Sequence, residues 1–194
     1  MSPAAGPTPA ELLALALDRP ATLGSGRLIC IDGPAGSGKT TWAAGITGLR
    51  PDARVVHMDD LYAGWSGLQE VDAQLDGLLL PLAEDRPGSY RRYDWLAGEF
   101  AEQVVVDPGP VLVVEGVGCG ASRFAELVTL LVWVEAPEHI RMERGLARDG
   151  DAFAPHWTQW AADEAEVFAR ERTRVRADVR IDGAQPYPAS APKR

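Results

Sequence analysis

The stretch ICIDGPAGSGKTTW, residues 29–42, decides the fold of this 194-residue chain. Residues 33–40 match the pattern G-x-x-x-x-G-K-[ST], with an apolar run before it and a helical segment after it, which is the context that this motif requires. Such a loop turns its backbone N–H groups toward phosphate oxygens, and the helix that follows adds its positive end. We therefore expect the loop to bind the phosphates of ATP. The predicted binding residues are Gly33, Pro34, Ala35, Gly36, Ser37, Gly38, Lys39, Thr40 and Thr41.

Lys39 stands out because the chain contains only one other lysine, Lys193, although lysine and arginine together number 19. Arginine ends in a bulky planar fork, whereas lysine is a compact charge on a slim stem. We expect only the slim stem to fit inside a tight ring of backbone amides, where Lys39 reaches the β- and γ-phosphates and the Thr40 hydroxyl ligates Mg²⁺. The alternative is a glycine-rich turn without a ligand. No N-K-x-D signature of GTPases occurs.

The composition restricts the class of protein. The formal net charge of −9 argues against nucleic acid as the main partner, because nucleic-acid binding favours a basic face. Two cysteines, Cys30 and Cys119, form no disulfide framework, which favours a reducing cytoplasm. The apolar run over residues 12–17 is too short to span a membrane. We therefore expect a cytoplasmic protein with small-molecule partners, no nucleic acid and no membrane association, while the sequence leaves the oligomeric state open.

Five short apolar runs predict strands that are buried on both faces, because they do not alternate cleanly between apolar and polar residues. Segments with helical periodicity lie between them, and strands that alternate with helices give a parallel sheet wrapped by helices. We predict an α/β fold of the P-loop NTPase type, with three layers and a five-stranded parallel sheet, in a single domain over residues 1–194. Residues 1–24 form an N-terminal helix, opened by a capping box from Thr8 to Glu11, and a linker. Residues 183–194 form a flexible tail. The five runs are Arg27–Asp32, Arg54–Met58, Val111–Glu115, Thr129–Glu135 and Ala177–Asp182.

Acidic residues follow two of these strands. Asp59 and Asp60 come at the end of the second run, and Glu115 ends the third. Ligands of open α/β sheets bind at the carboxyl ends of the strands, so one carboxylate could accept a proton from an attacking hydroxyl and another could hold Mg²⁺. We predict a metal site formed by Thr40, Glu115 and Asp59, and we treat Asp59 and Asp60 as facing opposite ways along the strand. The alternative is that these residues cap helices or turns.

The ordered pieces GPAGSGKTT, HMDDLY, VLVVEGV, RMERGLARD and ADVRID resemble the uridine–cytidine kinase branch of the P-loop kinases, and also the related pantothenate kinases and phosphoribulokinases. The order and spacing match from about residue 27 to residue 182. The resemblance implies ATP-dependent phosphorylation of a hydroxyl group on a small molecule, with Mg²⁺.

The resemblance also implies roles for individual residues. Asp59 takes the place of the general base, Tyr62 and Tyr93 line the acceptor pocket, and Asp94 lies beside Tyr93. Two departures lie in segments that grip the nucleoside in this family: Gly98 replaces a histidine, and the sequence AGWSGLQEVD replaces a longer segment. The identity of the acceptor therefore stays open. Trp65, Tyr93 and Trp95 could form an aromatic pocket or pack in the core.

Three arginines, Arg141, Arg144 and Arg148, have the spacing i, i+3, i+7 and share one face of a predicted helix. The family has its lid here, and such a lid brings guanidinium groups onto the transferring phosphate. We predict that Lys39, Asp59, Arg144 and Arg148 are catalytic and that Arg141 contacts the substrate. The alternative is a solvated face. The DGDAFAP segment that follows is short for a lid.

Together these features predict a Mg²⁺- and ATP-dependent kinase whose acceptor is a nucleoside or a nucleoside-like alcohol. One alternative is a kinase of nucleoside monophosphates, to which Arg91 and Arg92 could contribute, or of another metabolite or an antibiotic. The other is a nucleotide-binding regulator that does not catalyse transfer.

Overall fold

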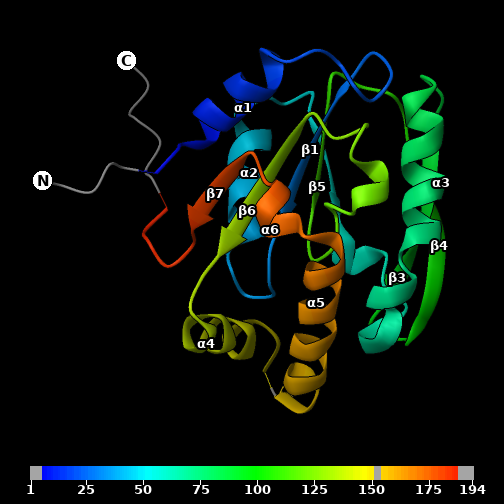
Figure 1. The fold of residues 1–194 in the computed structure, drawn as a ribbon. Coiled ribbons are helices and arrows are strands. Elements are labelled where there is room, and N and C mark those ends of the chain that lie inside the picture. The colour runs from blue at the N-terminus through cyan, green and yellow to red at the C-terminus, as the bar shows by residue number, and fades with distance from the viewer. Residues whose placement is uncertain (1–5, 151–153, 188–194) are drawn as a thin grey trace, which may run out of the picture.

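A computed structural model describes residues 6–150 and 154–187 of the protein. Its centre is a five-stranded sheet in the order β2-β5-β1-β6-β7, and every neighbouring pair is parallel (Figure 1). The predicted α/β fold with a five-stranded parallel sheet is confirmed. The strands are β1 (Arg27–Asp32), β2 (Arg54–His57), β5 (Val111–Glu115), β6 (Leu130–Glu135) and β7 (Val179–Asp182).

Helices cover both faces of the sheet. On one face α1 (Pro9–Leu17) packs against α2 (Lys39–Leu49), and apolar side chains of both join a core with those of the central strands. The predicted capping box opens α1, because Thr8 Oγ1 accepts the Glu11 N–H at 3.2 Å while the Glu11 carboxylate accepts the Thr8 N–H at 2.7 Å. On the other face lie α3 (Asp72–Ala83), α5 (Trp157–Glu171) and the short α6 (Thr173–Arg176).

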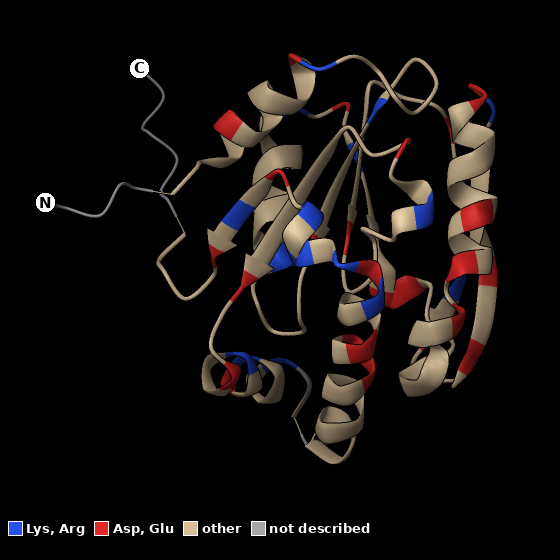
Figure 2. Ribbon diagram, viewed as in Figure 1, with Lys and Arg blue, Asp and Glu red and all other residues tan. Residues whose placement is uncertain are grey.

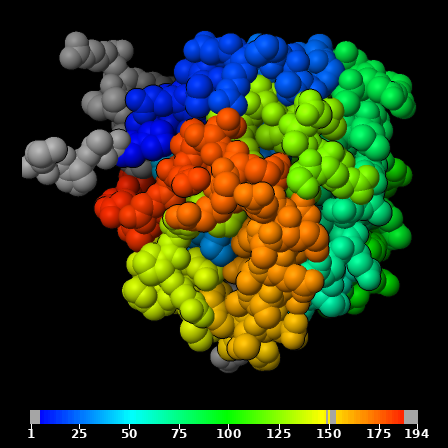
Figure 3. Space-filling view, in the orientation of Figure 1, coloured from blue at the N-terminus to red at the C-terminus, as the bar shows by residue number. Residues whose placement is uncertain are grey.

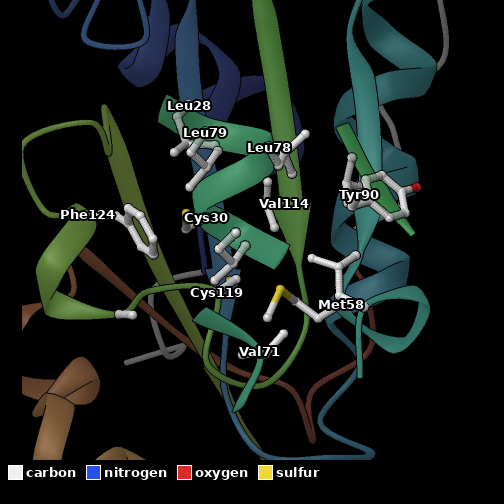
Figure 4. Packing of buried hydrophobic residues seen from close by; sticks show 14 of the residues in the cluster. Leu28, Cys30, Met58, Val71, Leu78, Leu79, Tyr90, Val114, Cys119 and Phe124 are labelled. Atoms are coloured by element: carbon white, nitrogen blue, oxygen red, sulfur yellow. The ribbon is translucent and has the colours of Figure 1, made fainter. Parts of the chain in front are cut away.

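The core under α3 and α5 is apolar and includes both cysteines, which are free thiols (Figure 4). Leucines of α3 meet side chains of β1 and β5, and the burial of such aliphatic groups is what stabilises each layer against the next. The sheet therefore holds its strand ends, and the loops that leave them, in fixed positions. Members of this core shown in Figure 4 include Leu28, Cys30, Leu78, Leu79, Val114 and Cys119.

An antiparallel hairpin was not predicted from the sequence. It consists of β3 (Gly88–Asp94) and β4 (Glu99–Val106), and β3 packs against α3. Its strands carry many charged and exposed residues, so no continuous apolar run marks them. The turn between these strands, residues 95–98, reaches the candidate site described below.

The predicted second and fifth strands were too long. β2 ends at His57, because residues 58–60 form the 3₁₀ turn η1 (Met58–Asp60), and β7 begins only at Val179. The interpretation that Asp59 and Asp60 alternate along a strand is therefore wrong, since neither residue belongs to a strand.

The first and last described segments of the chain lie close to each other, since Pro9 and Tyr187 both lie beside Gly45 of α2. In the predicted flexible tail, residues 183–187 are described, and the Tyr187 ring packs edge-on against Trp42 with a centroid distance of 5.2 Å. The prediction for residues 188–194 lies outside the described residues, as does that for residues 1–5. Within the described part of the chain, none of the helices has the length and apolar character needed to cross a membrane.

Candidate active site

The phosphate-loop motif, residues 33–40, connects β1 to α2 at the carboxyl end of the sheet. Gly33, Gly36 and Gly38 have φ angles of +139°, +76° and +102°, which favour glycine. A Cβ atom at Gly33 would lie 2.0 Å from the Val134 carbonyl oxygen, and one at Gly36 would lie 2.3 Å from that of Arg141. The loop thus needs glycine both for its backbone conformation and for its close contact with the surrounding chain.

Lys39 is the first residue of α2 and is only 7% exposed. Its ammonium group donates to the carbonyl oxygens of Gly33, at 2.8 Å, and Pro34, at 3.0 Å. The preceding Gly38 offers no side-chain cap to the first amides of α2, which leaves the positive helix end open to an anion. Among the described residues, the buried Ser37 hydroxyl has no hydrogen-bond partner. This donor set fits the oxygen atoms of a nucleotide's phosphates.

Thr40 and Glu115 lie together, as predicted for a Mg²⁺ site. The Thr40 hydroxyl donates to Glu115 Oε1 at 3.0 Å. Burial by itself raises the pKa of Glu115, but its hydrogen bond with His57 and the charge of Lys39 keep that pKa below its ordinary value. An ionised carboxylate and a hydroxyl are oxygen ligands suited to Mg²⁺. The described residues contain no group of three or more His, Cys, Asp or Glu side chains that could hold a metal ion. Asp59, the third predicted ligand, lines the same pocket as Thr40 and Glu115, and its role as a ligand stays a prediction.

His57 pairs with Glu115 in a way that the sequence analysis missed. These residues are register partners across β2 and β5, and His57 Nδ1 lies 2.6 Å from Glu115 Oε1. This hydrogen bond raises the pKa of His57 despite its partial burial. The pairing depends on the sheet register, which the sequence does not show.

Asp32 was also missed. Its carboxylate is fully buried at the end of β1 and accepts N–H groups of Gly33, Gly118 and Gly120 at 2.7–2.9 Å. Burial raises the pKa of Asp32, while the hydrogen bonds from the three N–H groups oppose this shift. Asp32 therefore fixes the loop after β5 against the phosphate loop.

Asp59 and Asp60, both in η1, line a cavity that the phosphate loop also lines and that is called the pocket below. The Asp59 carboxylate lies 3.9 Å from Arg148 Nη1, and both side chains are more than half exposed. Burial raises the pKa of Asp60, while the charge of His57 opposes that shift. The structure thus offers two carboxylates rather than one as candidate bases on this side of the pocket.

Aromatic side chains from three separate segments form one wall of the pocket. Trp65 comes from η2 (Gly64–Glu70), Trp95 from the hairpin turn and Trp160 from α5. The Trp65 ring meets that of Trp95 at 5.0 Å and that of Trp160 at 6.0 Å, both edge-on. Tyr62 also lines the pocket, and its buried hydroxyl donates to the Val117 carbonyl oxygen at 2.7 Å. Trp160 thus joins Trp65 and Trp95 in this wall, although it was not among the residues predicted for an aromatic pocket.

Tyr93 and Asp94 lie behind this wall and are not among the described residues that line the pocket. The Tyr93 ring packs edge-on against Trp95 at 5.4 Å. Asp94 accepts the N–H groups of Leu96 and Ala97, each at 3.0 Å, and so closes the hairpin turn. Their geometry supports the turn that carries Trp95.

The three predicted arginines lie on α4 (Glu138–Asp149), beyond the carboxyl end of the sheet (Figure 2). Arg144 and Arg148 line the pocket, and Arg144 also donates to the carbonyl oxygen of Gly183 at 2.9 Å. Arg141 instead contacts Glu164 and the backbone of the phosphate loop, and it is not among the described lining residues. The predicted lid segment includes residues 151–153, which lie outside the described part of the chain.

These elements enclose a single pocket of about 640 Å³. Figure 3 shows a hollow between α4 and α5, with part of the blue segment that contains the phosphate loop at its bottom. The pocket runs from the loop residues Ala35, Gly36, Gly38, Lys39 and Thr40 to the carboxylates and the aromatic wall. Thr41 lies exposed on the first turn of α2 and is not among its described lining residues.

Comparison with known proteins finds sequence similarity to kinases. Curated uridine kinases from Borrelia garinii subsp. bavariensis and from Borreliella burgdorferi are each 28% identical to the chain over 138 alignment positions, which cover 63% of this chain and 67% of each relative. The chain resembles P-loop kinases of the uridine kinase type. No family model matches it.

Solved structures show the same fold. A structure described as a possible uridine kinase, from Bacillus stearothermophilus, has a TM-score of 0.58 and 21% identity, with 88% of this chain and 97% of that chain covered. A protein provisionally described as a fructose transport system kinase, from Silicibacter sp., has a TM-score of 0.59 and 22% identity, with 90% and 99% covered. The predicted fold is thereby confirmed, and the curated relatives together with these structures confirm the predicted resemblance.

Proposed function

We propose that this protein transfers the γ-phosphate of ATP, with Mg²⁺, to a hydroxyl group of a small aromatic or nucleoside-like alcohol. The reaction would take place in the cytoplasm, where the two free thiols stay reduced. The uridine kinases that the chain resembles support this proposal, although 28% identity leaves the acceptor open.

The observation that carries the proposal is the continuous pocket. One cavity of about 640 Å³ contains the phosphate-loop residues at one end and Asp59, Asp60 and the aromatic wall at the other. Direct transfer of a phosphoryl group requires that the donor and the acceptor lie in contact with each other within one site that excludes water. A nucleotide-binding regulator needs no acceptor space, so the size of this pocket favours transfer.

On the nucleotide side, Lys39 and the N–H groups at the start of α2 bind the β- and γ-phosphates. Thr40 and Glu115 would hold Mg²⁺, which when bound neutralises charge on the phosphate oxygens. Arg144 and Arg148 line the same pocket from α4, where their guanidinium groups stabilise negative charge that develops during transfer.

On the acceptor side, Asp59 accepts the proton of the attacking hydroxyl. Its carboxylate lies 3.9 Å from Arg148 Nη1 and lines the same cavity as the phosphate loop. Asp60 is the alternative base, because its carboxylate lines the same cavity and burial raises its pKa.

The wall of Trp65, Trp95 and Trp160 favours an acceptor with a flat ring, which such rings bind by offset or edge contacts. Ring contacts discriminate weakly between bases, so we expect several aromatic alcohols to serve. Because the chain departs from the family in the two segments that grip the nucleoside, we expect uridine not to be the best acceptor.

The structure gives little support to a nucleoside monophosphate as the acceptor. Arg91 donates to the carbonyl oxygen of Phe100 at 2.8 Å, and Arg92 pairs with Glu102 at 2.7 Å, within the hairpin. Neither arginine is among the described residues that line the pocket. A second phosphate group would therefore lack the cationic partner that these residues were expected to supply.

The experiment is a measurement of ADP release from Mg·ATP, with and without a panel of nucleosides, nucleoside monophosphates, pantothenate, sugars and hydroxylated antibiotics. The proposal predicts that ADP release is slow with Mg·ATP alone and that at least one ring-bearing alcohol accelerates it strongly. Release at the same rate with every compound would favour an acceptor-independent ATPase or a regulator. ADP release that only nucleoside monophosphates accelerate would identify the protein as a nucleoside monophosphate kinase instead.

A further inference from the structure

A buried ion pair between Arg141 and Glu164 grips the phosphate loop from outside the pocket. Arg141 Nη1 lies 3.1 Å from Glu164 Oε1, and the two side chains are only 12% and 4% exposed. Arg141 comes from α4 and Glu164 from α5, so the pair joins these helices behind the loop.

Both peptide groups of Ala35 are held by this pair. The Ala35 N–H donates to Glu164 Oε2 at 2.9 Å, and the Ala35 carbonyl oxygen accepts from Arg141 Nη1 at 3.1 Å. Arg141 is itself fixed, because its Nε donates to the carbonyl oxygen of Ala136 at 3.1 Å and its guanidinium lies over the Trp157 ring at 5.4 Å. One loop residue is thus bound by two helices through charge-assisted hydrogen bonds.

The contact continues at the next residue of the loop. A Cβ atom at Gly36 would lie 2.3 Å from the backbone carbonyl oxygen of Arg141, so the loop lies directly against α4 at the position of Arg141. Ala35, Gly36 and Gly38 line the pocket, but the Ala35 N–H is committed to Glu164 and does not point to a phosphate.

The charges of the pair matter because a nucleotide is strongly anionic. The Glu164 carboxylate lies beside the phosphate loop and would repel a nucleotide if its charge were not balanced. Burial raises the pKa of Glu164, while the Ala35 N–H and the charges of Lys39 and Arg141 oppose that shift. The positive charge of Arg141 therefore balances the negative charge of Glu164, which the loop needs as the hydrogen-bond acceptor for the Ala35 N–H.

We infer that Arg141 and Glu164 are positioning residues, which hold the Ala35 peptide so that the rest of the loop presents its N–H groups to the phosphates, and that neither contacts a substrate. This inference deepens the proposed function and rests on it. It replaces the contact with substrate that the family resemblance implied for Arg141.

The first test compares Arg141→Met, Glu164→Gln and the double variant by the dissociation constant for Mg·ATP, measured calorimetrically without an acceptor. Arg141→Met leaves an unpaired buried carboxylate and should weaken binding by about tenfold or more. Glu164→Gln keeps an acceptor for the Ala35 N–H and should be milder. The double variant should bind better than Arg141→Met, because it buries no unpaired charge at this point. Arg141→Lys, which keeps the charge without the planar fork, should restore only part of the affinity.

The matched control is the exposed pair formed by Arg123 and Asp76, whose charged atoms lie 2.6 Å apart and away from the loop. Arg123→Met and Asp76→Asn should leave Mg·ATP binding unchanged. Thermal unfolding of every variant shows whether a loss of affinity exceeds what a loss of stability explains.

The second test is amide hydrogen exchange at Ala35 by NMR in the nucleotide-free protein. Slow exchange that becomes faster in Arg141→Met supports the inference. Fast exchange in the unaltered protein would overturn it. Normal Mg·ATP affinity in Arg141→Met would also overturn it, and a raised acceptor KM in that variant would return Arg141 to the substrate site. If the unaltered protein binds no Mg·ATP, the proposed function fails, while the exchange of Ala35 still decides whether the pair positions the loop.

Discussion

Replacing Asp59 by asparagine removes the basicity of this side chain and keeps its size. The change should be tolerated by the fold for two reasons. The Asp59 side chain is 59% exposed, and the contact from Trp95 Nε1, at 2.9 Å, is made to the backbone oxygen of residue 59, which the substitution retains.

The size of the expected effects separates catalysis from stability. The pair of Asp59 and Arg148 is exposed on both sides and 3.9 Å apart, so its loss should cost less than about 1 kcal/mol of stability. Loss of a general base costs about 10²–10⁴ in rate, which is roughly 2.7–5.4 kcal/mol of transition-state stabilisation. The fall in kcat should therefore greatly exceed any shift in unfolding.

The assay compares kcat, the Mg·ATP dissociation constant and thermal unfolding for Asp59→Asn and the matched variant Asp60→Asn. We expect kcat to fall about a hundredfold or more in Asp59→Asn, with ATP binding largely kept and Asp60→Asn milder. Both carboxylates line the pocket, so an inactive Asp60 variant beside an active Asp59 variant would assign the base to Asp60. Activity in both variants would refute a general base on η1.

Three further predictions follow from single contacts. Lys39→Arg should lose nearly as much activity as Lys39→Ala, because the Lys39 ammonium donates to the carbonyl oxygens of Gly33 and Pro34 in a geometry that a planar fork does not reproduce; a kinase assay showing near-normal turnover of the arginine variant would contradict this. Tyr62→Phe should lower the unfolding free energy by about 1–3 kcal/mol, since the Val117 carbonyl loses its partner, and should hardly change the acceptor KM; a large rise in KM would show that the hydroxyl contacts the acceptor. Burial by itself would raise the pKa of Glu171, but hydrogen bonds from Ser122 and Arg170 lower this pKa to about 2. The stabilising contribution of Glu171 is therefore present above pH 4.5 and is lost as the pH falls toward 2. The difference in unfolding free energy between the unaltered protein and Glu171→Gln should shrink across that window, and a constant difference would contradict the lowered pKa.

Much of the fold could be predicted from the sequence, because its main strands are buried on both faces. β1, β5 and β6 appear as unbroken apolar runs whose limits the structure reproduces to within a residue. The hairpin of β3 and β4 could not be predicted in this way, since most of its residues are only partly buried and the strands are stabilised by pairing with each other and by contact with α3. Likewise the 3₁₀ turn at Met58–Asp60 follows β2 with no glycine or proline to mark the end of the strand.

For the candidate site, local motifs were informative and long-range partners were not. The phosphate loop is one contiguous segment, and its glycines and lysine were found from spacing alone. The pairing of His57 with Glu115 depends on sheet register, and that of Arg141 with Glu164 depends on how two helices pack. Trp160 lines the pocket from a helix whose periodicity indicates only burial. Residues of this kind become visible only when the segments are brought together in space.

The most direct test of the central claim is mass spectrometry of the acceptor after incubation with the protein and Mg·ATP. The account predicts that the best ring-bearing alcohol of the panel gains one phosphoryl group, in an amount equal to the ADP formed. It also predicts that the gain disappears in Lys39→Ala and when Mg²⁺ is chelated. ADP formation with release of inorganic phosphate and no phosphorylated acceptor, across the whole panel, would contradict the assignment as a kinase.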